Sequence, residues 1–116
     1  MVNLRFSTDE DLLMREPNLD QVFPRKDRAG NKLRDWDVQH QLAMDELERR
    51  LRALKNTPEQ FRMGQVGLRA REQLRPVAAA LALMYIYTAA DTQGDINGYF
   101  ARKIRHYKDE ANEALR

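Results

Sequence analysis

Residues 77–90 read VAAALALMYIYTAA, a run in which Thr88 is the one side chain that is neither apolar nor aromatic. Alanine and leucine are strong helix formers, and a helix that is apolar on nearly every side is buried. The run is shorter than the roughly 20 apolar residues that a membrane-spanning helix needs. We therefore expect a helix over 71–90 at the centre of a folded domain, with Pro76 in its first turn or at a kink.

Two amphipathic segments flank this central helix. In residues 37–55, apolar side chains recur mostly at spacings of three and four, and Asp37 is a candidate N-cap. The apolar positions are Val38, Leu42, Ala43, Leu47, Leu51 and Leu54. In residues 96–116, the apolar stripe consists of Ile96, Phe100, Ile104, Tyr107, Ala111 and Leu115. Short connections between helices favour antiparallel neighbours. The sequence predicts an all-α fold, a small antiparallel helical bundle with a long amphipathic C-terminal helix, in which the central helix lies between the other two.

Shorter elements are expected elsewhere. Ser7 and Glu10 have the spacing of a capping box, which predicts a short helix that ends before Pro17. Residues 18–23 are expected to form a further turn. Residues 57–70 include two glycines, so we expect a connection with at most a turn or two of helix there.

The length of 116 residues, without a low-complexity tract, fits one domain. We divide it into an N-terminal docking segment (1–24), a basic loop (25–36), a helical core (37–104) and a C-terminal docking segment (105–116). The chain has no cysteine, which excludes disulfides and thiolate metal sites and favours a reducing compartment. The N-terminus lacks the pattern of a signal peptide, so export is not expected.

The charge balance does not require a nucleic-acid partner. Twenty lysines and arginines are offset by 18 acidic residues, which leaves a net charge of +2. The exception is the basic loop, whose cations are Arg25, Lys26, Arg28, Lys32 and Arg34. These side chains are candidates for contact with DNA or with an acidic partner. Asp27 and Asp35 dilute the cluster, so a solvated loop is the alternative.

No pattern of a catalytic or metal site is found in the sequence. There is no nucleophile elbow or phosphate-binding loop, and no base is identifiable beside Ser7 or Thr8. The carboxylates of residues 9–11 suit the first turn of a helix. His40 and His106 each lack a second histidine nearby, so both are expected to be ordinary surface residues. We therefore expect a protein that is not an enzyme and binds no cofactor or metal.

The four tyrosines, Tyr85, Tyr87, Tyr99 and Tyr107, admit two interpretations. They could form a stacking platform for single-stranded nucleic acid. Their positions on or beside the apolar faces of two expected helices favour packing between helices instead.

Several segments, taken in order, resemble the helical head-to-tail connector family of tailed bacteriophages, also called adaptor or head-completion proteins. The segments are Phe6-Ser7-Thr8 with Asp11-Leu12-Leu13, Leu42-Ala43 with Leu47 and Leu51, Arg71 to Pro76 with Ala79, Leu81-Ala82-Leu83 and Tyr85-Ile86-Tyr87, and Phe100-Ala101-Arg102-Lys103 with Tyr107-Lys108 and Ala114-Leu115. The resemblance covers most of the chain, although its motifs are degenerate and residues 57–70 have no counterpart in it.

This resemblance implies a structural virion protein that forms a ring of twelve copies on the portal protein. The ring would line the DNA channel, contact DNA non-specifically and present a platform for a tail or stopper protein. It would lie at the head–tail interface of the virion, after assembly in the host cytoplasm. The family's carboxy-terminal part commonly reaches into the portal, and the C-terminal stripe has no following element to cover it. The portal-docking candidates are therefore Ile104, Tyr107, Ala111 and Leu115.

The alternative is a small helical DNA-binding or regulatory protein that uses the basic loop. A helix-turn-helix protein would need an exposed polar recognition helix, whereas the strongest helix of this chain is apolar nearly all round. A generic helical partner protein with no virion role is a second alternative.

Overall fold

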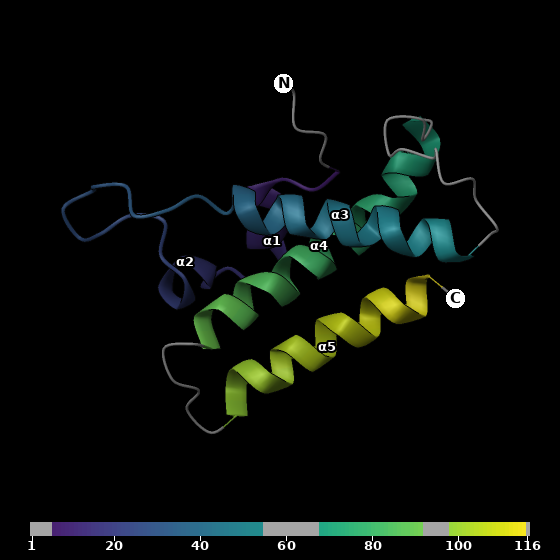
Figure 1. Ribbon diagram of the computed structural model, residues 1–116. Helices are drawn as coiled ribbons and strands as arrows, with labels where there is room; N and C mark the ends of the chain where they lie inside the picture. Colours follow the sequence, from purple (N-terminus) through teal and green to yellow (C-terminus); the bar gives the residue numbers. More distant parts are fainter. Residues whose placement is uncertain (1–5, 55–67, 92–97, 116) are drawn as a thin grey trace.

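The computed structural model describes residues 6–54, 68–91 and 98–115, in which it places five helices (Figure 1). They are α1 (Asp9–Arg15), α2 (Leu19–Val22), α3 (Asp37–Leu54), α4 (Leu68–Asp91) and α5 (Tyr99–Ala114). The described residues contain no β-strand, only an isolated bridge between Lys26 and Lys32. The prediction of an all-α helical bundle is confirmed.

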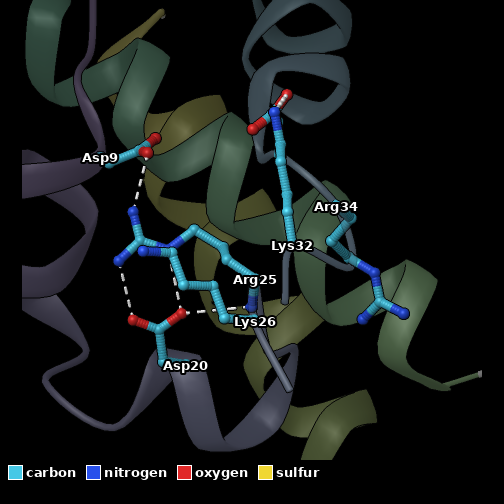
Figure 2. Close-up of a pocket in the computed structure, with 7 residues that line it drawn as sticks. Asp9, Asp20, Arg25, Lys26, Lys32 and Arg34 are labelled. Atoms are coloured by element: carbon cyan, nitrogen blue, oxygen red, sulfur yellow. Dashed lines mark hydrogen bonds and ion pairs between the residues drawn. The ribbon is translucent and has the colours of Figure 1, made fainter. Parts of the chain in front are cut away.

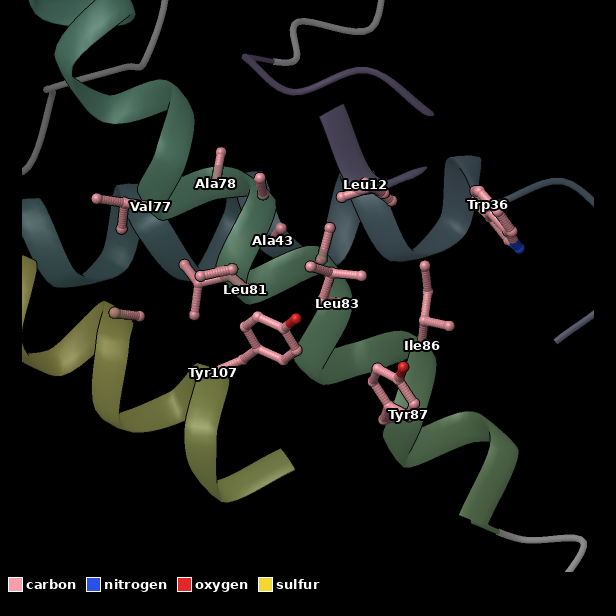
Figure 3. Packing of buried hydrophobic residues seen from close by; sticks show 14 of the residues in the cluster. Leu12, Trp36, Ala43, Val77, Ala78, Leu81, Leu83, Ile86, Tyr87 and Tyr107 are labelled. Atoms are coloured by element: carbon pink, nitrogen blue, oxygen red, sulfur yellow. The ribbon is translucent and has the colours of Figure 1, made fainter. Parts of the chain in front are cut away.

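Helix α4 lies between α3 and α5 and packs against both, as the apolar run predicts (Figure 1). Every residue from Val77 to Leu83 is buried, and further along the helix Ile86 and Tyr87 are buried as well (Figure 3). The helices reverse direction from α3 to α4 and again from α4 to α5, so α3 and α5 run the same general way. Two expectations, the stripe position Ile96 and most of the 57–70 connection, lie outside the described residues.

Pro76 lies inside α4, after more than two helical turns, and not in the first turn. A proline has no N–H to donate to the carbonyl four residues earlier, and its ring crowds that carbonyl. Figure 3 shows the axis of α4 changing direction beside Val77. Of the two expectations for Pro76, the kink is the one that the structure shows.

The N-cap of α1 is Thr8, one residue later than the sequence predicts. Its hydroxyl accepts a hydrogen bond from the backbone N–H of Asp11 at 3.3 Å, and the Asp11 carboxylate accepts from the Thr8 N–H at 2.8 Å. Ser7 does not cap the helix because its hydroxyl is hydrogen-bonded to His40 inside the core. A similar one-residue shift occurs at α3, where Asp37 is the first helical residue and the Trp36 carbonyl accepts the first helical hydrogen bond.

Four apolar side chains of the N-terminal segment belong to the core, and the docking role of the segment stays a prediction. Its buried side chains are Phe6, Leu12, Leu19 and Phe23. Ion pairs connect α1 and the residue after it to the long helices: Arg75 to Asp11 at 2.8 Å, Arg15 to Glu110 at 2.8 Å and Lys103 to Glu16 at 2.6 Å. This segment therefore covers α4 and α5 within the subunit.

Candidate functional site

The basic loop has a defined structure. The Asp27 carboxylate accepts hydrogen bonds from the backbone N–H groups of Ala29 at 2.9 Å and Asn31 at 2.8 Å. Gly30 sits at a φ of 86°, a left-handed conformation that glycine adopts without strain. Lys26 and Lys32 pair across the turn through the backbone. The loop therefore presents its cations from a fixed backbone.

Arg25 is a structural residue and not a free cation. Its guanidinium bonds Asp20 through Nη2 at 2.8 Å and Nε at 3.0 Å, and Asp9 through Nη1 at 3.0 Å (Figure 2). It also lies over the Trp36 ring, 4.2 Å from the ring centroid. The hydrogen bonds from Arg25 lower the pKa of Asp20, and those to Asp20 raise the pKa of Arg25. Arg25 thus connects the loop to α1 and α2.

Four of the five loop cations border one hollow of about 560 Å³. It is lined by Asp9, Asp20, Arg25, Lys26, Lys32, Arg34 and Asp35 (Figure 2). Lys32 pairs with Asp35 at 2.9 Å, and the Arg34 guanidinium lies 4.1 Å from the centroid of the Phe23 ring. Arg28 is exposed on the loop and does not line the hollow. The cations best placed to bind an anion are therefore Lys26 and Arg34.

His40 is completely buried, and the expectation that it is a surface residue is wrong. Its Nδ1 is 2.8 Å from the Ser7 hydroxyl and its Nε2 is 2.8 Å from the Asp9 carboxylate. An ionised carboxylate only accepts, so Nε2 donates to Asp9 and a neutral ring accepts the Ser7 proton at Nδ1. Through Asp9 and Arg25 the network continues to Asp20 and joins α1, α2, α3 and the loop.

The Ser7, His40 and Asp9 arrangement has the composition of a hydrolase triad but not the access. Ser7 is 1% exposed, so a substrate does not reach its hydroxyl in this conformation. Asp9 is shared between His40 and Arg25. The hydrogen bonds among Ser7, His40 and Asp9 give each of their buried polar groups a partner inside the core. The structure therefore supports a role in stabilising the fold for all three residues.

The sequence did not show that these residues meet. Its members Asp9 and His40 are 31 positions apart, and Ser7 and His40 are 33 apart. His40 does lie between the apolar positions of α3 that face the core, and that placement was the only available hint.

The C-terminal stripe is covered by the subunit itself. Tyr107 and Ala111 are buried, and Ile104 and Leu115 are half-buried against the same core. The Tyr107 hydroxyl donates to the Glu16 carboxylate, and burial raises the pKa of that tyrosine. The premise that this stripe lacks a cover is therefore wrong. Of the four portal-docking candidates, Ile104 and Leu115 are the ones that a partner can reach.

The tyrosines contribute to packing between helices, which is the interpretation that the sequence favoured over a stacking platform for nucleic acid. Tyr87 and Tyr107 are buried, with nearly parallel rings whose centroids are 6.3 Å apart. Tyr99 lies edge-on to Tyr87 at 6.3 Å and is partly exposed. These rings join α4 to α5.

The exposed apolar side chains form a separate group. Among the residues that the structure describes, the large ones are Met14, Leu33, Val38, Leu42 and Tyr99. Val38 and Leu42 are one turn apart on α3 and keep 62% and 42% of their area exposed. Both positions belong to the pattern that the sequence assigned to the buried face, but they point away from α4. The structure thus leaves apolar area uncovered on a helix whose core contacts are made by other residues.

No protein-family model, curated protein or solved structure matches this chain. Within the described residues, no three histidine, cysteine or acidic side chains are grouped so that they could hold a metal ion. None of the helices in the described part of the chain combines the length and apolar character of a membrane span.

Proposed function

We propose that this chain is a structural subunit of a head-to-tail connector of a tailed bacteriophage. In this proposal twelve copies form a ring on the portal protein, contact a tail or stopper protein on the other side and surround the DNA channel. The chain performs no catalysis and needs no cofactor. It acts at the head–tail interface of the virion and is made in the host cytoplasm.

The observation that carries this proposal is the exposed apolar area of α3 on a small subunit whose core is already closed. Val38 and Leu42 are exposed one turn apart on α3, and contiguous exposed apolar area marks protein interaction sites. The resemblance of the segments to connector proteins supplies the kind of interaction, and the all-α bundle is compatible with it. Ion pairs within the subunit hold α1 and α2 against the rest of the fold. The subunit therefore folds before it binds its neighbours.

The basic hollow supports a minor electrostatic role. Lys26 and Arg34 present their charges beside a depression on the surface, whereas Arg25 and Lys32 are paired with carboxylates. In the connector these cations contact the phosphates of passing DNA or an acidic partner, without reading sequence.

Electron microscopy of the purified protein, alone and mixed with portal-bearing heads, tests the proposal. A connector gives ring-shaped particles or additional density on the portal vertex. Uniform monomers that leave the portal vertex bare would reject it.

The second candidate function is that of a small DNA-binding or regulatory protein, which the basic hollow favours. Replacing Lys26 and Arg34 with serine should then flatten the dependence of log affinity on log salt by about 1.8, because each phosphate contact contributes about 0.9. Arg28→Ser is the matched control, since it removes a charge of the same loop outside the hollow. Equal effects of the control and the double variant would show that the hollow is not a DNA site.

A further inference from the structure

The outer face of α3 combines apolar and acidic side chains. Val38 and Leu42 are exposed one turn apart, and exposed Asp45 follows on the same face. Asp45 accepts a hydrogen bond from Gln41 at 3.0 Å and forms no ion pair with the residues that the structure describes. This face lies opposite the side on which Ala43 and Leu47 pack against the core.

A groove of about 530 Å³ runs along the exposed side of α5. Ala101 and Ile104 give it an apolar strip, and Arg105 and Lys108 contribute positive charge to its lining. Asp91, Asp109 and Asn112 complete the lining. Neither cation forms an ion pair within the described part of the chain, unlike Lys103, which bonds Glu16 on the other side of the helix. The groove therefore combines apolar contact with two cations that have no ion pair in the described part of the chain and two carboxylates.

The charges along the two helices follow opposite orders. From Asp35 to Glu48 the chain has five carboxylates and no lysine or arginine, and Arg49 follows. From Arg102 to Lys108 it has four lysines or arginines and no carboxylate, and Asp109, Glu110 and Glu113 follow. The order on α5 is unfavourable for its own helix dipole, which prefers acids at the start and bases at the end. The stability of α5 alone therefore does not explain this order of charges.

We propose that the outer face of α3, with Val38, Leu42 and Asp45, docks into the α5 groove of a second copy, beside Ala101, Arg105 and Lys108. This inference rests on the proposed ring and names the surfaces that join its neighbours. The two surfaces differ from each other, so the contact is head-to-tail, and repeated head-to-tail contacts close into a ring when the rotation allows.

The helix directions agree with this contact. Helices α3 and α5 run the same general way in one subunit (Figure 1). Neighbours in a ring of twelve differ by a rotation of about 30°, so α3 of one copy keeps the same general direction as α5 of the next. The acidic first half of α3 then lies beside the basic first half of α5. The complementary charges of the two first halves favour a second copy as the occupant.

Disulfide trapping tests the contact, because the chain contains no cysteine of its own. Leu42→Cys and Ala101→Cys proteins are mixed, alone and with portal-bearing heads, and oxidised. The expected product is a cross-link between the two variants, with little product from either variant by itself. Met14→Cys is the control, because Met14 is an apolar residue of α1 that is 83% exposed and outside both surfaces.

Charge reversal gives a second readout. Asp45→Lys and Lys108→Glu should each reduce trapping by about tenfold, the effect of roughly 1.4 kcal/mol, and the variant with both changes should recover. Arg28→Glu alters the net charge as much as Lys108→Glu does and should have no effect.

The outcomes separate this inference from the proposed function. Absence of the Leu42–Ala101 cross-link in both preparations, or an equal cross-link to Met14→Cys, overturns the inference. Trapping of Leu42→Cys with itself would indicate a symmetric dimer and overturn it as well. If rings form on the portal but this cross-link is absent, the inference is wrong and the connector function still holds. If the cross-link forms but the protein does not bind the portal, the contact between copies holds and the connector function is rejected.

Discussion

Replacing the buried histidine of α3 tests whether the internal polar network stabilises the fold. In His40→Ala the Ser7 hydroxyl loses its partner inside the core, which costs about 1–3 kcal/mol. Removal of a fully buried ring leaves space that the surroundings fill only in part, which costs about 2 kcal/mol more. Asp9 keeps its ion pair with Arg25, so no charge is left unpaired.

The expected loss of unfolding free energy is therefore about 3–5 kcal/mol, a large share of the 5–15 kcal/mol typical of a domain. Urea denaturation followed by circular dichroism measures it, and the midpoint should fall by about 2 M. His106→Ala is the matched control, because His106 is exposed on α5 and its loss should stay within about 0.5 kcal/mol. A double-mutant cycle with Ser7→Ala should show coupling of about 1 kcal/mol.

Two results would refute this reasoning. One is a loss below about 1 kcal/mol in His40→Ala, which would mean that the network contributes no more than a surface contact. The other is strict additivity of the His40 and Ser7 substitutions, because two hydrogen-bonded partners should not act independently.

Three further predictions concern the core and its acid sensitivity. Leu83→Asp should abolish the cooperative thermal transition in circular dichroism, because an unpaired carboxylate in the fully buried part of α4 costs several kcal/mol; a wild-type melt would contradict this. Truncation after Ile104 should cost about 3–5 kcal/mol through the loss of buried Tyr107, and an unchanged melting temperature would argue otherwise. The third is a loss of stability as pH falls below about 4.5, the ordinary pKa of a glutamate such as Glu16. Burial raises the pKa of Glu16, but hydrogen bonds from Lys103 and Tyr107 outweigh this and lower it, so its stabilisation is present above the unfolded value and is lost in acid. Thermal melts of Glu16→Gln and wild type at about pH 6 and pH 3 measure this difference, and the same acid sensitivity in both proteins would disprove the assignment.

The long helices were predictable because their signal is local. The run from Val77 to Leu83 is apolar on every side, and only a buried helix accommodates it. Spacings of three and four gave α3 within one residue of its ends. The positions of Val38 and Leu42 show the limit, since both fit the apolar pattern yet face outward.

For the hollow beside the basic loop, the sequence predicted which cations come together but not the contacts that they make. The sequence grouped Arg25, Lys26, Lys32 and Arg34, and the structure does bring them to one hollow. It did not show that Arg25 is paired with Asp9 and Asp20, or that His40 is internal. Asp9 is 16 positions from Arg25 in the sequence, and no local sequence pattern predicts contacts over that separation.

The sequence by itself determined the helical class, the central place of α4 and the amphipathic character of α5, because these depend on side chains within one or two turns of each other. The tertiary structure alone decided which polar groups meet. Tyr107 reaches Glu16 across 91 positions, and Lys103 reaches the same carboxylate across 87. These pairings follow from how the helices pack, so the packing also decided that the C-terminal stripe closes the core and that the outer face of α3 remains exposed.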